Sequence, residues 1–135
     1  MATPPVHRLT PDEYLQFERA ADTKNEYYDG EIFAMSGGSL NHSFIASMAV
    51  AILHSQAPSG CRVFSSDMRI RIPEGRSYVY ADAGLVCGEP QAGDGPADNL
   101  QNPALIVEVL SPSTERHDRG LKFQLYQTIE SFCEY

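Results

Sequence analysis

The chain has 135 residues, a length that fits one domain with a core of its own. Ten basic residues against eighteen acidic ones give a formal net charge of −8, which argues against binding nucleic acid through an overall positive charge. The N-terminal residues show no cationic stretch followed by an apolar segment, and no later segment approaches the ~18 uncharged apolar residues that span a bilayer. We therefore expect neither a secretion signal nor a membrane partner.

The cysteines and histidines indicate the redox state and argue against zinc. Cys61, Cys87 and Cys133 are an odd number without a C-x-x-C pair, and each lies in or beside an apolar run. That pattern is typical of reduced core residues rather than of a disulfide framework. The four histidines are scattered without short ligand spacing, so a zinc site is not expected. The sequence thus predicts a cytoplasmic protein with reduced thiols.

The first expected elements are a helix and a hairpin. Thr10-Pro11-Asp12-Glu13 combines a hydroxyl cap, a proline in the first turn and an acid three residues after the cap, which predicts a helix from Pro11 to about Ala20. In the segment 26–35, Asp29-Gly30 lies between two strand-like arms. This pair favours the positive φ of a tight hairpin turn.

A second helix is expected from Asn41 to His54. Its apolar residues recur at helical spacing, namely Phe44, Ile45, Met48, Ala49, Ile52 and Leu53. The pattern predicts one apolar face that packs on a sheet.

The middle of the chain reads as strands. From Cys61 to Ile72, apolar and charged residues alternate, which predicts a strand with one exposed face. The denser apolar runs Tyr78 to Cys87 and Ala104 to Leu110 predict central strands that are covered on both faces. Between them, Gly88 to Asn102 is rich in Gly, Pro, Asp and Asn, and we expect an exposed loop there.

A last helix is expected from about Arg116 to Glu130, with Leu121, Leu125 and Ile129 on its buried stripe. After it, the segment 132–135 begins to look like another strand. The whole chain is therefore interpreted as a single α/β domain, residues 1–135, that stops before its sheet is complete.

Glu108 is the most informative anomaly of the sequence. It lies in the apolar run Ala-Leu-Ile-Val-Glu-Val-Leu, on the same strand face as Ile106 and Leu110, and an unpaired carboxylate inside a dry strand costs several kcal/mol. Asp82 repeats the anomaly in the preceding apolar run. Two acids on adjacent buried strands can share one divalent cation, which offsets their repulsion. The alternative is that each acid sits at a strand end, where it caps a loop or meets an arginine.

These residues and their neighbours resemble the PD-(D/E)XK nuclease superfamily, specifically its branch of small bacterial restriction-endonuclease-like proteins. The similarity covers essentially the whole chain, and it is carried by the segments 25–32, 41–42, 81–82 and 102–114 together with Asp118, Lys122 and Tyr126. It implies a restriction-endonuclease-like fold, with a mixed central sheet flanked by helices, here C-terminally truncated because the family's usual last strands are missing. Ala81 stands where the family motif usually has proline.

The resemblance also implies roles for individual residues. Asp82 and Glu108 would ligate Mg²⁺ or Mn²⁺, and the backbone carbonyl of Val109 would complete the protein's share. Glu26 would assist the metal directly or through water, although an ordinary surface acid of the hairpin explains it equally well.

Lys122 would be the lysine of the motif. In the simplest pattern the lysine lies two residues after the glutamate, where this sequence has Leu110, so the ammonium would come from the next helix. Lys122 and Tyr126 are four residues apart and share a helix face. The alternative is an ordinary solvated lysine. His42 matches a common position at a helix start, where we expect a structural role before a catalytic one.

The implied function is a metal-dependent nuclease that hydrolyses phosphodiester bonds, with DNA as the expected nucleic acid. A fifteen-residue stretch contains four arginines that would contact the nucleic-acid backbone or else form a solvated hairpin face: Arg62, Arg69, Arg71 and Arg76. A degenerate, non-catalytic nuclease-like binding module and a metal-stabilised structural domain are the alternatives. A homodimer is expected, because an incomplete sheet presents an unpaired edge at 132–135.

Overall fold

The computed structural model describes residues 8–35, 37–93 and 95–135. Helix α1 (Pro11–Ala20) begins as predicted. The Thr10 hydroxyl accepts a hydrogen bond from the backbone N–H of Glu13, and the Glu13 carboxylate accepts one from the N–H of Thr10. This reciprocal capping satisfies two of the otherwise unpaired donors of the first turn. None of the described helices combines the length and apolarity that a membrane crossing requires.

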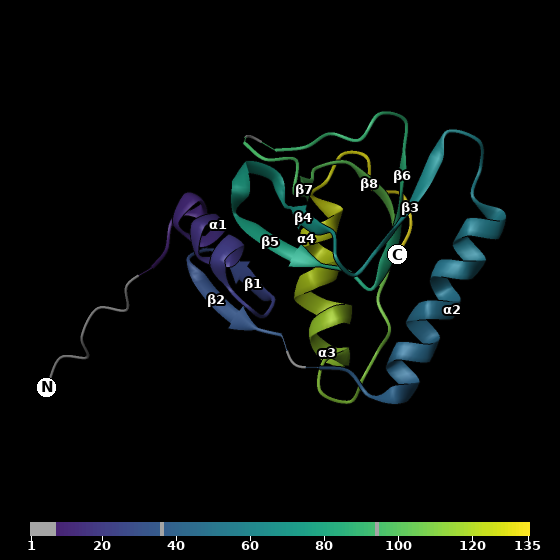
Figure 1. Cartoon of the computed structure of the whole chain (residues 1–135), viewed down its shortest axis with the longest axis horizontal. Coiled ribbons are helices and arrows are strands. Elements are labelled where there is room, and N and C mark those ends of the chain that lie inside the picture. The colour runs from purple at the N-terminus through teal and green to yellow at the C-terminus, as the bar shows by residue number, and fades with distance from the viewer. Residues whose placement is uncertain (1–7, 36, 94) are drawn as a thin grey trace, which may run out of the picture.

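The predicted hairpin is also confirmed. Strands β1 (Asn25–Tyr28) and β2 (Glu31–Ala34) pair antiparallel, and Asp29 and Gly30 between them have φ of 44° and 101°. A short polar residue and a glycine tolerate this left-handed region at low cost. The hairpin and α1 lie at one end of the molecule (Figure 1).

The described strands form two sheets, with the orders β2-β1-β5-β4-β7 and β3-β6-β8. The remaining bounds are β3 (Cys61–Ser65), β4 (Arg69–Arg71), β5 (Ser77–Tyr80), β6 (Ala83–Cys87), β7 (Asn99–Leu100) and β8 (Pro103–Val107). β4 and β7 run parallel, whereas the other described neighbours run antiparallel. The predicted mixed sheet flanked by helices is therefore confirmed, although it is divided into two parts.

The division occurs inside a run that the sequence predicted as one strand. Residues 78–87 form the end of β5 and all of β6, which belong to different sheets, and Asp82 lies at the break. The segment 61–72 likewise contains β3 and β4, separated by a turn in which the N–H of Met68 donates to the carbonyl of Ser65. The segment expected to be an exposed loop ends in the buried strand β7.

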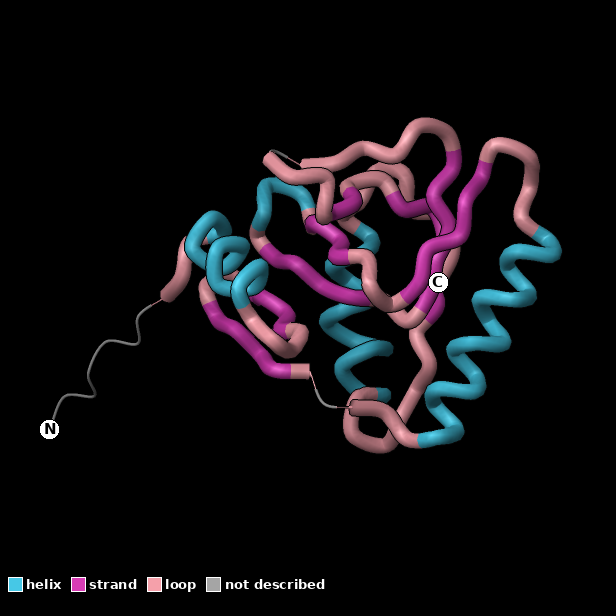
Figure 2. The backbone as a smooth tube through the Cα atoms, viewed as in Figure 1, coloured by secondary structure: helices cyan, strands magenta, loops and turns pink. Residues whose placement is uncertain are grey.

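Helix α2 (Leu40–Gln56) confirms the predicted helix but not its burial. Five large apolar side chains are more than half exposed, namely Leu40, Phe44, Ile45, Met48 and Ile52. None of the residues of α2, all of which are described, is buried. The helix lies at the other end of the molecule, beside β3 and β6 (Figures 1 and 2). The apolar residues of α2 are distributed around the whole circumference of the helix. Their spacing therefore could not show which face meets the sheet.

The expected redox state of the cysteines is wrong. Cys61 and Cys87 form a disulfide, and Cys133 is free and exposed rather than in the core. Cys61 and Cys87 are facing partners on β3 and β6, with 4.0 Å between their Cα atoms. Only the register of these strands brings the two thiols together, and the sequence spacing of 26 residues does not reveal it.

The last helical segment consists of α3 (Glu115–His117), a π-helical turn η2 (Asp118–Lys122) and α4 (Phe123–Gln127). Its position is close to the predicted one, but the predicted buried stripe is confirmed only in part: Ile129 is buried in the core and Leu125 packs against it, whereas Leu121 does not. Leu121 is 48% exposed, whereas Lys122 and Tyr126 are almost inaccessible. A π turn holds one more residue than an α turn, and it changes which side chains face the core. Near the chain end, Glu134 forms a parallel bridge with Leu105 of β8.

Candidate metal and catalytic site

Asp82 and Glu108 lie side by side where strands β6 and β8 of the second sheet end. Asp82 immediately precedes β6, and Glu108 immediately follows β8. The two strands pair antiparallel with Ala83 opposite Val107, and the N–H of Asp82 donates to the carbonyl of Val107 over 3.1 Å. The acids were expected inside their strands, and both lie at strand ends. There the backbone ladder stops and carboxylates can turn into a cleft.

Asp82 is held in place by the backbone and faces the first turn of α2. Its Oδ2 accepts a hydrogen bond of 2.7 Å from the N–H of Val109. Its Oδ1 lies 3.5 Å from Nε2 of His42, and the carboxylate is 18% exposed. His42, expected to be structural, therefore belongs to the wall of this site.

Glu108 is the more deeply buried of the two acids. Its Oε1 accepts a hydrogen bond of 2.9 Å from the Tyr126 hydroxyl and lies 3.0 Å from Nζ of Lys122. Burial raises the pKa of Glu108 to about 8; Lys122 opposes this shift, and Asp82 adds to it. Burial therefore disfavours the charged form of this carboxyl group, and a nearby positive charge offsets that effect.

Lys122 projects from the end of the π turn into the site. It is 4% exposed, and its Nζ donates to the carbonyl of Tyr80 over 2.7 Å and lies 3.1 Å from Oε2 of Glu26. Burial lowers the pKa of Lys122, but Glu108 and Glu26 outweigh it and raise the pKa above its ordinary value. Lys122 is therefore a buried ammonium and not a solvated helix lysine.

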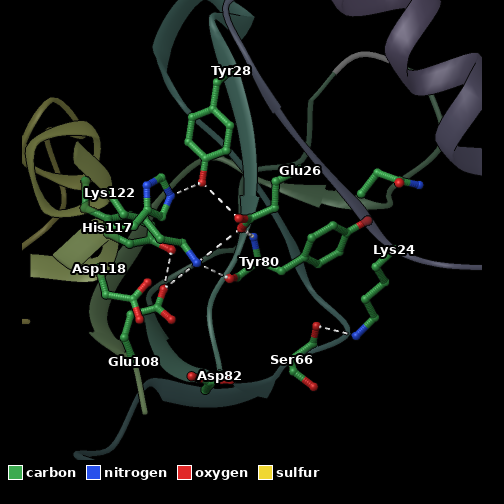
Figure 3. Close-up of polar contacts among 12 residues, drawn as sticks. Lys24, Glu26, Tyr28, Ser66, Tyr80, Asp82, Glu108, His117, Asp118 and Lys122 are labelled. Carbon is green, nitrogen blue, oxygen red and sulfur yellow. Dashed lines mark hydrogen bonds and ion pairs between the residues drawn. The ribbon is translucent and has the colours of Figure 1, made fainter. Parts of the chain in front are cut away.

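Glu26 lies beside Lys122, on β1, and not on the hairpin surface. Its Oε2 accepts a hydrogen bond of 2.8 Å from the N–H of Tyr80, and its Oε1 accepts one of 2.9 Å from the Tyr28 hydroxyl (Figure 3). The residue is 8% exposed. Both carboxylate oxygens already have partners. In this structure Glu26 therefore binds and orients the ammonium of Lys122.

Two further residues of the site were missed. Tyr28 shares a face of β1 with Glu26, so the period of two along a strand could have indicated it. Its hydroxyl lies 2.8 Å from Nε2 of His117, and the two rings meet edge to face. His117 lies 89 positions away along the chain, and no local pattern predicts that contact.

The site residues line a cleft of about 400 Å³. One wall is formed by Met35 and by Gly37 to Ser39, and another by the loop Ser111 to Thr114. Asp82, Glu108 and Lys122 lie along it.

The four arginines do not gather at this cleft, since none of them is among the described residues that line it. Arg69 is 8% exposed; its Nε donates to the Tyr80 hydroxyl, and its Nη1 lies 3.2 Å from Asp98. Arg76 pairs with the neighbouring Glu74. This position argues against the expected contact of Arg69 with nucleic acid, because its guanidinium is directed to interior partners.

The donors fit a hard divalent cation. Among the described residues, no three His, Cys, Asp or Glu side chains cluster closely enough to hold a metal ion. Asp82 and Glu108 could supply two carboxylates and Val109 a backbone carbonyl, and Glu108 Oε2 accepts no hydrogen bond from the described residues. Mg²⁺ commonly takes one or two carboxylates and keeps several waters, so this oxygen set is compatible with Mg²⁺ or Mn²⁺.

The fold and the acids at one sheet edge define a restriction-endonuclease-like domain. A family described as "Uma2: Putative restriction endonuclease" matches residues 11–135, and the chain belongs to this family.

Two relatives come from Synechocystis sp. (strain ATCC 27184 / PCC 6803 / Kazusa). "Uncharacterized protein slr1290" is 42% identical over 123 residues, which cover 90% of this chain and 64% of that protein. "Uncharacterized protein sll1609" is 38% identical over 128 residues, which cover 94% of this chain and 72% of that protein. The chain thus spans only about two thirds of the length of these relatives.

The fold is similar to the crystal structure of "a putative nuclease belonging to DUF820" from Anabaena variabilis ATCC 29413. The TM-score is 0.69 at 20% sequence identity, and the match covers 88% of this chain and 68% of that one. At this identity the likeness shows the fold alone.

Proposed function

We propose that this protein is a metal-dependent nuclease that hydrolyses phosphodiester bonds, with DNA as its first expected substrate. The observation that carries the proposal is the position of a buried ammonium, Lys122, 3.0 Å from Glu108 at the sheet edge where Asp82 also lies. Membership of a restriction-endonuclease-like family supports it, because such proteins generally use divalent metal ions.

Each residue of the site has its own proposed role. Asp82, Glu108 and the carbonyl of Val109 would hold Mg²⁺ or Mn²⁺. When bound, such an ion polarises a phosphoryl oxygen and lowers the pKa of a nearby water. Lys122 is already protonated, so it would orient the attacking water and stabilise negative charge on the phosphate rather than remove a proton.

Contacts with the nucleic-acid backbone would come from outside the cleft. Arg62 and Arg76 are exposed and Arg71 is half-buried, so we propose these three as the positive contacts in preference to the buried Arg69. Binding through them would weaken as salt increases, because phosphate contacts release counterions.

The test is cleavage of DNA with Mg²⁺, Mn²⁺ or EDTA, using the wild type and Asp82→Asn. We expect cleavage by the wild type with either ion, and none with EDTA or with the variant. Absence of wild-type cleavage of both DNA and RNA with both ions would exclude the proposal.

A non-catalytic binding module is the second candidate, favoured by the net charge of −8 and by the engagement of Glu108 with Lys122 and Tyr126. Metal titration and binding assays without cleavage distinguish it from the nuclease. The cytoplasmic location expected from the sequence stays a proposal. The disulfide Cys61–Cys87 is an observation against it, because disulfides are rare in that compartment.

We also propose a homodimer. Two surfaces favour it: the strand-like end near Glu134, and α2, which contains no Asp, Glu, Lys or Arg and exposes Phe44 and Met48. An uncharged helix is a surface where two acidic molecules can meet with little repulsion. Light scattering at micromolar concentration should give twice the chain mass, and Phe44→Glu should restore the monomer if α2 is the interface. A monomeric wild type would exclude the homodimer.

A further inference from the structure

We propose that Tyr28 and His117 are positioning residues that act through Glu26 to hold the ammonium of Lys122 against Glu108. The inference rests on the proposed nuclease function and adds two residues to its site. The contacts form one series: His117 Nε2 to Tyr28 Oη, 2.8 Å; Tyr28 Oη to Glu26 Oε1, 2.9 Å; and Glu26 Oε2 to Lys122 Nζ, 3.1 Å (Figure 3).

The direction of the hydrogen bonds follows from the chemistry of the groups. A carboxylate only accepts, so the single proton of the Tyr28 hydroxyl points to Glu26. The hydroxyl oxygen can then only accept from His117, so Nε2 of His117 must carry a proton. Burial, reinforced by Glu26, raises the pKa of Tyr28 above its ordinary value, and the hydroxyl therefore remains a donor.

Glu26 needs these partners because its carboxylate side chain is only 11% exposed. Oε2 receives hydrogen bonds from Lys122 and from the N–H of Tyr80, whereas the Tyr28 hydroxyl is the partner of Oε1 among the described residues. Without that hydroxyl, Oε1 would have no donor on this side and the carboxylate could rotate. Rotation would also move Oε2 away from Lys122.

Lys122 in turn has three N–H donors and three acceptors around it, namely Glu26, Glu108 and the carbonyl of Tyr80. This arrangement fixes the direction of the ammonium. Small displacements of a positioned group, on the order of 1 Å, can reduce a rate ~100-fold. The loss of the Glu26 contact is therefore expected to affect the chemical step more than substrate binding.

The series also joins the hairpin to the last helical segment. Tyr28 ends β1 of the hairpin, and His117 ends α3 beside the loop Ser111 to Thr114. A hydrogen bond between them fixes the hairpin relative to the helix that carries Lys122. A local core contact would not have this arrangement, since it would not end on a proposed catalytic group.

The experiment compares kcat, KM and metal affinity for Tyr28→Phe, His117→Phe and His117→Gln. Tyr28→Phe and His117→Phe keep the rings and remove the hydrogen bonds, and each should lower kcat about 10- to 100-fold with KM and metal affinity unchanged. His117→Gln can still donate from its amide and should recover much of the rate. The double variant Tyr28→Phe/His117→Phe should be no slower than Tyr28→Phe, because both changes break one series.

Tyr27→Phe is the matched control. The Tyr27 hydroxyl donates to the carbonyl of Leu9 on the other side of β1, so its removal should leave kcat unchanged. Equal losses of kcat in Tyr27→Phe and Tyr28→Phe would reduce Tyr28 to a structural role and overturn the inference.

A second measurement does not depend on cleavage. The chain has two lysines, Lys24 and Lys122, so side-chain NMR with ¹⁵N-lysine should give one exposed and one buried signal. Tyr28→Phe should speed proton exchange at Lys122 Nζ and leave Lys24 unchanged. An unchanged Lys122 signal, or an altered signal with full kcat, would overturn the inference. If the wild type cuts nothing, the proposed function fails, while the NMR result still decides whether Tyr28 positions Lys122.

Discussion

Nζ of Lys122 and Oε1 of Glu108 are 3.0 Å apart, so the carboxylate proposed to bind the metal also pairs with the lysine proposed to act on the phosphate. Oε1 of Glu108 is used by Lys122 and Tyr126, which leaves Oε2 for a cation. Metal binding and the ammonium therefore share one side chain. Variants of the two residues should separate their roles.

Asp82→Asn and Glu108→Gln should each abolish Mg²⁺ and Mn²⁺ binding while the protein stays folded. Each removes one of two neighbouring negative charges and so relieves their mutual repulsion in the apo protein, although Glu108→Gln also weakens the contact with Lys122. Calorimetric titration measures the affinity. Asp67→Asn is the control, because Asp67 is exposed and pairs with Lys24. Wild-type binding that survives in both site variants would place the metal elsewhere.

Lys122→Met should keep metal binding and lower the cleavage rate by on the order of 100-fold or more. The protein should also lose stability, because Glu26 is left buried beside no cation; breaking a buried pair costs roughly 3–5 kcal/mol. The double variant Lys122→Met/Glu26→Gln should recover part of that stability and none of the activity. Chemical denaturation and single-turnover assays measure the two effects, with Lys24→Met as the control. A wild-type cleavage rate in Lys122→Met would remove Lys122 from the mechanism.

Asp98 should control part of the acid stability. A hydrogen bond from Arg19, together with Arg69, lowers the pKa of Asp98 to about 2 from the model-compound value of 3.8. A lowered folded-state pKa means that the stabilisation is present above the unfolded pKa and disappears as pH falls from about 4 towards 2. Asp98→Asn should thus be less stable than the wild type at pH 7, and the difference should shrink below pH 4. Urea unfolding across this range measures it, and a constant difference would contradict the assignment.

Gly84→Ala should disturb the site without touching it. A Cβ at Gly84 would meet the Phe64 ring and the carbonyl oxygen of Leu105, so β6 could not stay as close to β3 and β8. Overpacking of this kind costs about 1–3 kcal/mol. We expect a lower melting temperature and weaker metal binding, because β6 and β8 carry the two acids. Gly120→Ala, where nothing lies within 4 Å of the new Cβ, should change neither.

Local patterns predicted what local forces determine. The capped helix α1, the Asp29-Gly30 turn and the position of α2 depend on neighbours within a few residues, and each is present. Asp82 and Glu108 could be selected from the sequence because a carboxylate in an apolar run costs free energy unless a partner compensates its charge. This argument does not depend on where the strands lie.

What the sequence did not reveal depends on contacts between distant segments. The facing of Cys61 and Cys87 requires the register of β3 and β6, and the burial of Arg69 requires Tyr80 and Asp98. The change of helix face at Lys122 results from a π turn, which has no simple sequence period.

Tyr80 connects the cleft with a second polar cluster, formed by Arg69 and by Glu18 of α1. Its backbone N–H and C=O hold Glu26 and Lys122, while its hydroxyl accepts from Arg69 and donates to Glu18 of α1. The main chain at Tyr80 therefore cannot move unless two polar clusters separate together. Its amide proton should exchange with solvent as slowly as those of the central core, so the support for Lys122 outlasts the local openings that loops around a cleft undergo.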